Sequence, residues 1–387
     1  MITNTQALTE FCQRVGTADY ITVDTEFMRE KTYWPILCLV QVAGPDEAEC
    51  IDALADGIDL TPLYDLMADS SVLKVFHAAR QDLEIFFHLA GQIPHPVFDS
   101  QVAAMVCGFG DSVGYEALIT ELVNGRIDKG SRFTDWTLRP LSDRQIDYAL
   151  ADVTFLRPAY EKLAAKLHEN GRESWLEEEM AVLENPDTYN GNPREAFRRI
   201  KARNTSARML AVLRELAAWR ESEAQRRDVP RNRILRDESI AEIAHHTPKT
   251  PEDLARTRGL GDKLAHGNYG QQILEAVKVG KAIPDNECPK PIHKAKLPRG
   301  LGPVTDLLKV LLKMKSEESD VAGKLLASAS DIELIAAFGE DADVRSMAGW
   351  RREVFGNDAL KLRSGELSLA VKGKKVKVFP TPTGENG

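Results

Sequence analysis

The sequence predicts an α/β fold in which a mixed β-sheet is covered by helices, followed by one or two small all-α domains. In the first hundred residues, short β-branched and apolar runs are separated by turn signals or by stretches with helical spacing. From residue 115 to residue 169 the spacing is helical throughout, with breaks at Gly125, Gly130 and Pro140. Strands followed by helices in this order are typical of a sheet with a helical cover.

The expected elements of the N-terminal part begin with a strand at residues 20–27. Two more strands follow at 36–43 and 49–52, and the turn-like Gly44-Pro45-Asp46 between them favours antiparallel pairing. The next elements alternate, with a helix at 60–68, a strand at 72–76, a helix at 81–90, a strand at 97–99 and a helix through 103–106. Three strands are therefore followed by a strand–helix–strand unit, which predicts a mixed sheet.

Two turn-rich linkers divide the chain of 387 residues into parts. Residues 185–193 contain dense turn signals, and residues 284–303 are rich in Pro and Lys. The expected domains are an α/β domain at 1–185, a helical domain at 206–282 and a second helical domain at 301–379. At the end of the last domain, two short apolar runs flank Gly373, which predicts a β-hairpin.

Composition excludes several classes of protein. No apolar run approaches the roughly 18 residues of a membrane helix, so we expect no membrane association. The N-terminus has no basic region followed by an apolar core, so no signal peptide is expected. Five cysteines are scattered without Cys-x-x-Cys spacing, which argues against a disulfide framework and a zinc site. These features predict a cytoplasmic protein.

The net charge of −9 disfavours a polyanionic ligand at first sight, but the charge is unevenly distributed. The stretch from Arg194 to Arg236 contains 13 Lys and Arg but only 5 Asp and Glu, an excess of eight positive charges within 43 residues. The overall charge therefore conceals a basic zone.

Four acidic residues are candidates for a metal site. Asp24 and Glu26 are two residues apart on the first predicted strand, so both side chains leave from one face. Two like charges side by side destabilise a strand unless a positive charge lies between them. Asp82 lies at the start of a predicted helix, and Asp152 follows Tyr148 by four residues, so those two side chains share a helix face. Taken singly, Asp82 also suits the positive end of a helix dipole, and Asp152 suits a solvated helix face.

Hard divalent cations such as Mg²⁺ prefer carboxylate oxygens, and four acids from separate elements can hold two of them. Two such ions about 4 Å apart can activate a water and stabilise a leaving oxygen in phosphodiester cleavage. We therefore expect two divalent cations, Mg²⁺ or Mn²⁺, as cofactors.

Three short motifs carry a family resemblance: Asp24-Thr25-Glu26, then Asp82 within residues 77–84, then Tyr148 with Asp152. They resemble the three exonuclease motifs of the DEDD superfamily, in its tyrosine-bearing branch. Residues 131–142 resemble the stretch that marks the ribonuclease D family within that branch. The resemblance covers roughly residues 1–280. It implies a ribonuclease H-like exonuclease domain that acts on RNA in the 3′ to 5′ direction.

The resemblance also implies roles for individual residues. Asp24, Glu26, Asp82 and Asp152 would be the metal-binding carboxylates, and Tyr148 would orient the attacking water. A phenol with an ordinary pKa of about 10 is a poor general base at neutral pH, so orientation is the more credible role for Tyr148.

Four further residues are candidate contacts for the RNA end. Phe27 and Met28 directly follow the first two acids and can wedge beside a terminal base. Trp136 and Arg139 can stack on the RNA end or clamp it. Packing in the protein core is the structural alternative for Phe27, Met28 and Trp136.

The first helical domain resembles the helicase-and-RNase-D C-terminal (HRDC) domain, with its pattern at residues 216–220. Five arginines of this region form a candidate track for RNA phosphates: Arg226, Arg227, Arg231, Arg233 and Arg236. A solvated basic helix face is the alternative. Residues 301–379 match the same domain type only faintly, as a degenerate second copy.

The predicted function is a metal-dependent 3′–5′ exoribonuclease that acts as a monomer. It would release 5′-mononucleotides from the 3′ ends of tRNA precursors and other small structured RNAs by two-metal-ion hydrolysis. One alternative is a DNA 3′–5′ exonuclease of the same fold, because recognition of the 2′-hydroxyl cannot be read from these residues. A second alternative is a non-catalytic RNA-binding scaffold, although the presence of all four acids and Tyr148 speaks against it.

Overall fold

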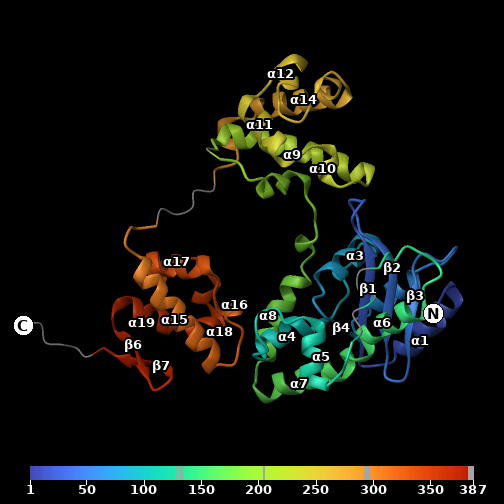
Figure 1. The fold of residues 1–387 in the computed structure, drawn as a ribbon, viewed down its shortest axis with the longest axis vertical. Coiled ribbons are helices and arrows are strands. Elements are labelled where there is room, and N and C mark those ends of the chain that lie inside the picture. Colours follow the sequence, from blue (N-terminus) through green and yellow to red (C-terminus); the bar gives the residue numbers. More distant parts are fainter. Residues whose placement is uncertain (128–129, 131–133, 204, 292–296, 382–387) are drawn as a thin grey trace, which may run out of the picture. The chain divides into compact units, whose positions relative to one another are not determined.

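The computed structural model describes residues 1–127, 130, 134–203, 205–291 and 297–381. The chain forms two compact units. The first comprises Met1–Glu26, Leu39–Thr188 and Ala295–Gly387, and the second comprises Phe27–Cys38 and Tyr189–Lys294. Figure 1 shows the sheet with its helices, and two groups of helices later in the chain.

The sheet of the first unit has the strand order β3-β2-β1-β4-β5. Its strands are β1 (Tyr20–Met28), β2 (Ile36–Ala43), β3 (Ala48–Asp52), β4 (Leu73–Phe76) and β5 (Val97–Asp99). β2 and β3 are antiparallel, whereas β1, β4 and β5 are parallel to one another. The sheet is therefore mixed, as predicted, and the α/β fold class is confirmed.

Central strand β1 is the strand on which the candidate site depends. Ile21 and Val23 on β1 are fully buried and point to the same face of the sheet, so apolar packing on that face fixes the position of the strand. β1 pairs with β4 from Tyr20↔Leu73 to Thr22↔Val75. Because the pairing is parallel, the chain leaves β4 beside the following residues of β1. The start of the next helix is thereby brought close to the two acids of β1.

Helices cover this sheet, and all of them except α2 are labelled in Figure 1. They are α1 (Thr5–Val15), α2 (Thr61–Ala68), α3 (Arg80–Ala90), α4 (Ser100–Val106), α5 (Tyr115–Val123), α6 (Asp143–Thr154), α7 (Leu156–Glu169) and α8 (Glu173–Leu183). α6 packs against β3, α7 against β4 and α8 against β5. The residue pattern did not predict α1, whose buried side chains include Leu8 and Phe11. None of the helices that the structure describes combines the length and apolar composition that a membrane crossing requires.

The second unit contains the helices of the basic zone. They are α9 (Ala207–Arg227), α10 (Arg231–Ile234), α11 (Asp237–His246), α12 (Pro251–Ala255), α13 (Asp262–Ala265) and α14 (Asn268–Ala282). The apolar faces of α9, α11 and α14 share one core, which includes Leu213, Ile240 and Ile273. Arg220 of α9 is 1% exposed and donates hydrogen bonds to the carbonyl oxygen of Leu235 and to Asp237 Oδ1 (2.6 Å).

The segment between β1 and β2 groups with these helices. The hydroxyl of Tyr33 donates to Glu221 Oε1 of α9 (2.5 Å), and Gln225 donates to the Tyr33 hydroxyl (3.2 Å). The backbone N–H groups of Tyr33 and Trp34 both donate to Asp228 Oδ1 (3.0 Å each). α9 and the residue after it therefore hold the tip of the β1–β2 connection.

The last part of the chain forms a module with its own core, at residues 301–380. Its elements are α15 (Gly302–Glu318), α16 (Gly323–Leu326), α17 (Ala329–Phe338), α18 (Gly349–Arg351), α19 (Asn357–Ser364), β6 (Leu367–Lys372) and β7 (Lys375–Pro380). Leu308, Ile332 and Phe355 are fully buried in this core. The hairpin predicted around Gly373 is confirmed as the antiparallel pair of β6 and β7.

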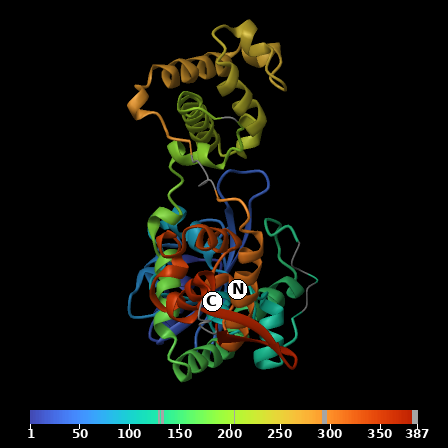
Figure 2. The ribbon, with the colours of Figure 1, turned by 90° about the vertical axis from the view of Figure 1, so that its left-hand side faces the viewer.

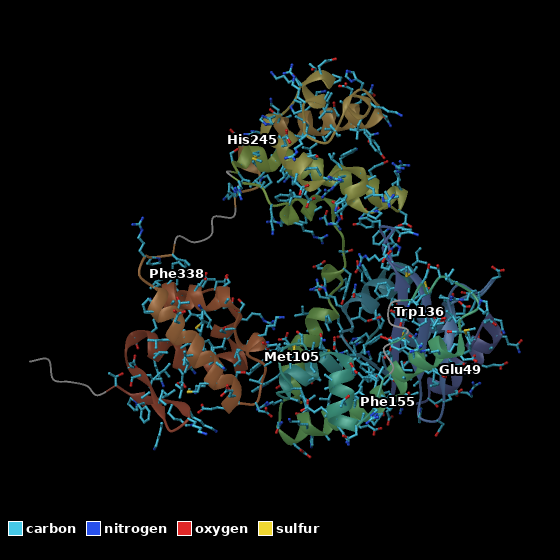
Figure 3. All side chains as sticks on the ribbon, viewed as in Figure 1. Glu49, Met105, Trp136, Phe155, His245 and Phe338 are labelled. Atoms are coloured by element: carbon cyan, nitrogen blue, oxygen red, sulfur yellow. The ribbon has the colours of Figure 1, made fainter. Side chains whose placement is uncertain are left out.

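This module packs against α4 and α8 within the first unit. Trp350 stacks on Trp175 with ring centroids 4.1 Å apart and an interplanar angle of 7°. Arg351, which is 3% exposed, forms ion pairs with Glu178 (2.7 Å) and with Glu179. Met105 at the end of α4, labelled in Figure 3, accepts a hydrogen bond at its carbonyl oxygen from the Ala322 N–H (2.8 Å). A buried ion pair, an aromatic stack and a backbone hydrogen bond therefore join the module to the sheet domain.

Candidate active site

The structure brings three of the predicted acids to one point. Carboxylate oxygens of Asp24, Glu26 and Asp152 lie within 4.8 Å of one another. Asp24 and Glu26 come from alternate positions of β1, and Asp152 comes from α6. Oxygen atoms alone make up this donor set, which suits hard divalent cations.

Asp82 lies beside this group, at the third residue of α3. It is 6% exposed, and the hydroxyl of Thr25, between the two acids of β1, donates a hydrogen bond to its Oδ1. Its charge contributes to raising the pKa values of both Asp24 and Glu26, so the four carboxylates interact electrostatically. The parallel pairing of β1 with β4 explains this proximity, because α3 follows β4.

Tyr148 lies four residues before Asp152 on α6 and faces the same side of the helix. Its hydroxyl is hydrogen-bonded to Asp152. Burial, together with the negative charges of Asp152, Glu26 and Asp24, raises the pKa of Tyr148. Tyr148 therefore keeps its proton at neutral pH and can act as a hydrogen-bond donor.

Two residues that the sequence did not single out hold α6 in place. The hydroxyl of Thr22 on β1 donates to the carbonyl oxygen of Val153 (2.8 Å). The hydroxyl of Tyr115 on α5 donates to the carbonyl oxygen of Asp152 (2.6 Å). No spacing in the sequence links Thr22 or Tyr115 to α6, because both contacts join residues that are distant along the chain.

The start of α6 is also well defined. Ser142 and Gln145 form a capping box, in which the Ser142 hydroxyl accepts from the Gln145 N–H and the Gln145 side chain accepts from the Ser142 N–H. Asp143 adds a negative charge in the first turn, where the helix dipole favours it. This local sequence fixes where α6 begins, and hence which residues face β1.

The electrostatics of the acid cluster indicate that it needs a cation. Burial and the charges of its acidic neighbours raise the pKa of Asp24 well above its ordinary value. Burial and the charges of Asp152 and Asp82 raise the pKa of Glu26 to about 8, and burial raises that of Asp82 to about 7. Without a positive charge, the carboxyls of Glu26 and Asp82 therefore retain protons near neutral pH. The oxygen donors and their mutual repulsion fit divalent cations.

Asp99 and His77 lie near the cluster and have structural roles. The carboxylate of Asp99 accepts from the N–H groups of Ala78 (3.0 Å) and Ala79 (2.9 Å) before α3, and it also caps α4. Burial lowers the pKa of His77 to about 4, so its ring is neutral. His77 Nδ1 lies 2.9 Å from the Ser100 hydroxyl oxygen. Both residues join the β4–α3 turn to α4.

The candidate contacts for the RNA end are placed as follows. Trp136, labelled in Figure 3, is 2% exposed, and its ring centroid lies 6.3 Å from that of Tyr148. The guanidinium of Arg139 donates to Asp52 at the end of β3 (Nε to Oδ2, 2.7 Å) and to the carbonyl oxygen of Trp136 (2.7 Å). Phe27 and Met28 end β1 and are half-buried. Residues 131–133 of the family-like segment lie outside the described residues.

The five arginines of the predicted phosphate track differ in their surroundings. Arg226 pairs with Glu223 (2.7 Å), Arg231 pairs with Glu221 (3.4 Å), and Arg227 donates to the hydroxyl of Tyr269 (2.6 Å). The side chains of the remaining two, Arg233 and Arg236, are exposed. Their role toward RNA stays a prediction.

Comparisons with known proteins agree with this site. Residues 1–168 match a family model described as 3′-5′ exonuclease, and residues 209–277 match the HRDC domain. The first match contains the four acids and Tyr148, and the second spans most of α9 to α14.

Full-length relatives extend the comparison to the whole chain. A ribonuclease D of Nitrobacter hamburgensis is 51% identical over 380 residues, which cover 98% of this chain and 99% of that protein. A ribonuclease D of Acidiphilium cryptum is 50% identical over 383 residues, with 99% and 97% covered. The crystal structure of Escherichia coli RNase D, described as an exoribonuclease involved in structured RNA processing, is 31% identical. It matches with a TM-score of 0.81 over 94% of this chain and 97% of that chain. The chain therefore belongs to the ribonuclease D family of exoribonucleases.

Proposed function

We propose that Asp24, Glu26, Asp82, Asp152 and Tyr148 hydrolyse the last phosphodiester bond at the 3′ end of RNA and release 5′-mononucleotides. The observation that carries this proposal is the convergence of Asp24, Glu26 and Asp152 within 4.8 Å, with buried Asp82 beside them. A mutually repelling set of carboxylates is costly to fold, and a catalytic role explains why it is present.

Members of this family depend on divalent metal ions, and the acid cluster fits such ions. We assign the four carboxylates to two of them, Mg²⁺ or Mn²⁺. When bound, such cations supply the positive charge that lets a water lose its proton near neutral pH and that stabilises the leaving oxygen.

The protein's own groups act by position. The Asp24, Glu26 and Asp152 carboxylates hold negative charge at one point, and the hydroxyl of Thr25 orients Asp82. Tyr148 keeps its proton because its pKa is raised, so it orients the attacking water through its hydroxyl and does not act as a base.

The proposed substrates are tRNA precursors with 3′ extensions and other small structured RNAs. The relative from Escherichia coli is described as acting in structured RNA processing, which supports this class. We propose that Phe27, Met28, Trp136 and Arg139 serve the RNA end and that the arginine track contacts phosphates. Trp136 and Arg139 are buried or engaged with protein groups, so they would act mainly by shaping the site beside Tyr148.

Three further assignments belong to this proposal. One chain supplies all the proposed catalytic groups, which supports action as a monomer. All five cysteines lie among the described residues, where they are buried and form no disulfide, which supports a cytoplasmic location. We also propose that residues 301–379 are a second, degenerate HRDC-like domain.

The order of helices supports that last assignment. In the first helical domain, a long α9 is followed by a 4-residue α10 and a 10-residue α11. In the C-terminal module, a long α15 is likewise followed by a 4-residue α16 and a 10-residue α17.

The test compares a 3′-extended tRNA with a single-stranded DNA of matched sequence, in Mg²⁺ or in EDTA. We expect 5′-mononucleotides from the RNA in Mg²⁺, and no product in EDTA or with Asp24→Asn. Asp65→Asn, which removes the same charge from an exposed position of α2, is the matched control and should remain active. RNA hydrolysis that persists both in EDTA and in the Asp24→Asn variant would contradict the assignment of the carboxylates to catalysis. Faster digestion of the DNA would favour the DNA exonuclease instead.

A further inference from the structure

The β6–β7 hairpin at the end of the chain has one strongly basic face. In the antiparallel register, Lys372 lies directly opposite Lys375. Because side chains alternate along a strand, Lys375, Lys377 and Phe379 point to the same face as Lys372. Gly373, with φ of +67°, is the first of the two turn residues, and Lys374 is the second. Figure 1 labels the two strands, and Figure 2 shows the hairpin in red.

The opposite face of the hairpin packs on the protein. Leu369, Val376 and Val378 are half-buried against the core of the C-terminal module. The side chains of Lys372, Lys374 and Lys375 are exposed, and Phe379 is 39% exposed. The apolar face therefore anchors the hairpin, and the basic face is presented outward.

The positive charges of this face are poorly compensated. Like charges directly opposite each other destabilise an antiparallel pair. Among the described residues, Glu318 pairs with Lys377 (2.9 Å), whereas Lys372, Lys374 and Lys375 have no ion pair. The hairpin thus retains a repulsion that its own fold does not relieve, and an anionic partner would relieve it.

A groove runs beside this face, between α15 and β7. Its volume is about 330 Å³. Four lysines (313, 374, 375 and 377) line it together with apolar Val310, Met314 and Val376 and with two acids of α15, Glu317 and Glu318. Apolar surface between regularly spaced cations suits a chain that alternates phosphates with sugars and bases.

We propose that this surface binds the phosphate backbone of the RNA substrate away from its 3′ end. We call it the hairpin surface, and it consists of Lys313, Lys372, Lys374, Lys375, Lys377 and Phe379. Lysines two residues apart on β7 are about 7 Å apart, which repeats positive charge along a line as an extended polyanion requires. The surface of an acidic protein presents negative charges spread over two dimensions. Neither the linear array of lysines nor the apolar groove complements such a surface.

The packing of the module gives this surface a mechanistic consequence. Through Arg351, Glu179 and the stacked Trp175 and Trp350, the hairpin belongs to the same compact unit as the acid cluster. RNA long enough to reach both sites gains affinity from both, whereas a short oligonucleotide engages the acid cluster alone. The inference rests on the proposed function, and it predicts that the contribution of the surface depends on substrate length.

The experiment compares two double variants of the full-length protein that lose the same charge. Lys372→Gln with Lys375→Gln removes two cations from the hairpin surface. Lys324→Gln with Lys361→Gln removes two exposed cations elsewhere in the same module. Binding of a 3′-extended tRNA is measured in EDTA, between about 50 and 200 mM salt. Hydrolysis of the same RNA and of a pentanucleotide is measured in Mg²⁺.

For the hairpin variant we expect RNA affinity to fall about threefold to tenfold. The slope of log K against log salt should decrease by about 1.4, or about 0.7 for each lost phosphate contact to a single strand. KM for the long RNA should rise with kcat unchanged, and neither constant should change for the pentanucleotide. The melting temperature should stay the same or rise, because a repulsion is removed. Lys372→Arg with Lys375→Arg, which keeps both positive charges, should bind the RNA with wild-type affinity.

Several results would overturn the inference. The first is a wild-type affinity and salt slope for the hairpin variant. The second is an equal loss of RNA affinity in the control variant, and the third is a similar loss of RNA affinity in the arginine variant, which keeps both charges. Loss of binding to polyglutamate with RNA binding intact would assign the surface to an acidic protein instead. Failure of the wild-type protein to cleave the pentanucleotide in Mg²⁺ would count against the proposed function, while the binding measurements in EDTA still decide the role of the hairpin surface.

Discussion

Replacing Glu26 with glutamine is expected to stabilise the metal-free protein and to flatten the dependence of its stability on pH. Burial and the charges of Asp152 and Asp82 raise the pKa of Glu26 from 4.5 to about 8. An acid with a raised folded-state pKa binds its proton more tightly in the folded chain than in the unfolded chain. The stability that this group contributes is therefore complete below pH 4.5 and is lost as pH rises through about 8.

The magnitude follows from the size of the pKa difference. Each unit corresponds to about 1.4 kcal/mol. For Glu26, the difference between 4.5 and about 8 amounts to roughly 5 kcal/mol when the carboxyl is fully ionised, and to roughly 3 kcal/mol at pH 7. Recovering about 3 kcal/mol should raise the melting temperature by roughly 6–12 °C.

The assay is thermal unfolding of EDTA-treated protein between about pH 5 and pH 9. Wild-type protein should lose stability across this range, whereas Glu26→Gln should lose less and should melt higher at pH 8. Glu169→Gln, which removes an exposed charge from α7 of the same unit, is the control and should follow the wild type. Addition of Mg²⁺ should flatten the wild-type profile and leave that of Glu26→Gln largely unchanged. A Glu26→Gln protein that melts lower than wild type at pH 8 would refute the reasoning.

Three further outcomes are expected. Tyr148→Phe keeps the ring but loses the hydroxyl that orients water, so single-turnover kinetics should show kcat reduced about 100-fold with RNA affinity retained; unchanged kcat would remove Tyr148 from the mechanism. Arg351→Ala removes the buried guanidinium that pairs with Glu178 and Glu179, whereas Arg345 still pairs with Glu179. Urea unfolding should therefore show a loss of about 2 kcal/mol, and limited proteolysis should release the C-terminal module; wild-type stability would mean that the ion pair is energetically neutral. Arg233→Gln combined with Arg236→Gln should lower the slope of log K for RNA binding against log salt by about 1.4. An unchanged slope would mean that these exposed arginines do not contact RNA phosphates.

The sequence was informative where local spacing decides geometry. Asp24 and Glu26 share a face because a strand has a two-residue period, and Tyr148 and Asp152 share a face because a helix turns every 3.6 residues. The capping box at Ser142 and Gln145 fixes the start of α6 by the same kind of local rule. Together with the helical spacing that puts Asp82 at the start of α3, these local rules place all five proposed catalytic residues on the correct elements.

Other features depend on contacts between distant residues, which spacing cannot reveal. Thr22 and Tyr115 hold α6 through hydrogen bonds to backbone carbonyl oxygens. Every residue has such a carbonyl, so the residue types of α6 do not indicate these contacts. Asp82 meets Thr25 because β1 and β4 are parallel, and pairing direction is not written in either strand. Likewise, the partnership of Arg351 with Glu179 spans 172 residues. Each of these contacts follows from the tertiary fold.

The connection between β1 and β2 has a consequence for how this enzyme can be divided or recombined. The strand that carries Asp24 and Glu26 continues into a tip whose Tyr33 is held by Glu221 and Asp228 of the helical part. Cutting the chain after residue 188 would leave that tip without its partners and would leave Glu221, 1% exposed in the intact protein, open to water. The exonuclease and first helical parts are thus matched components, and a chimaera between relatives should exchange the tip together with α9.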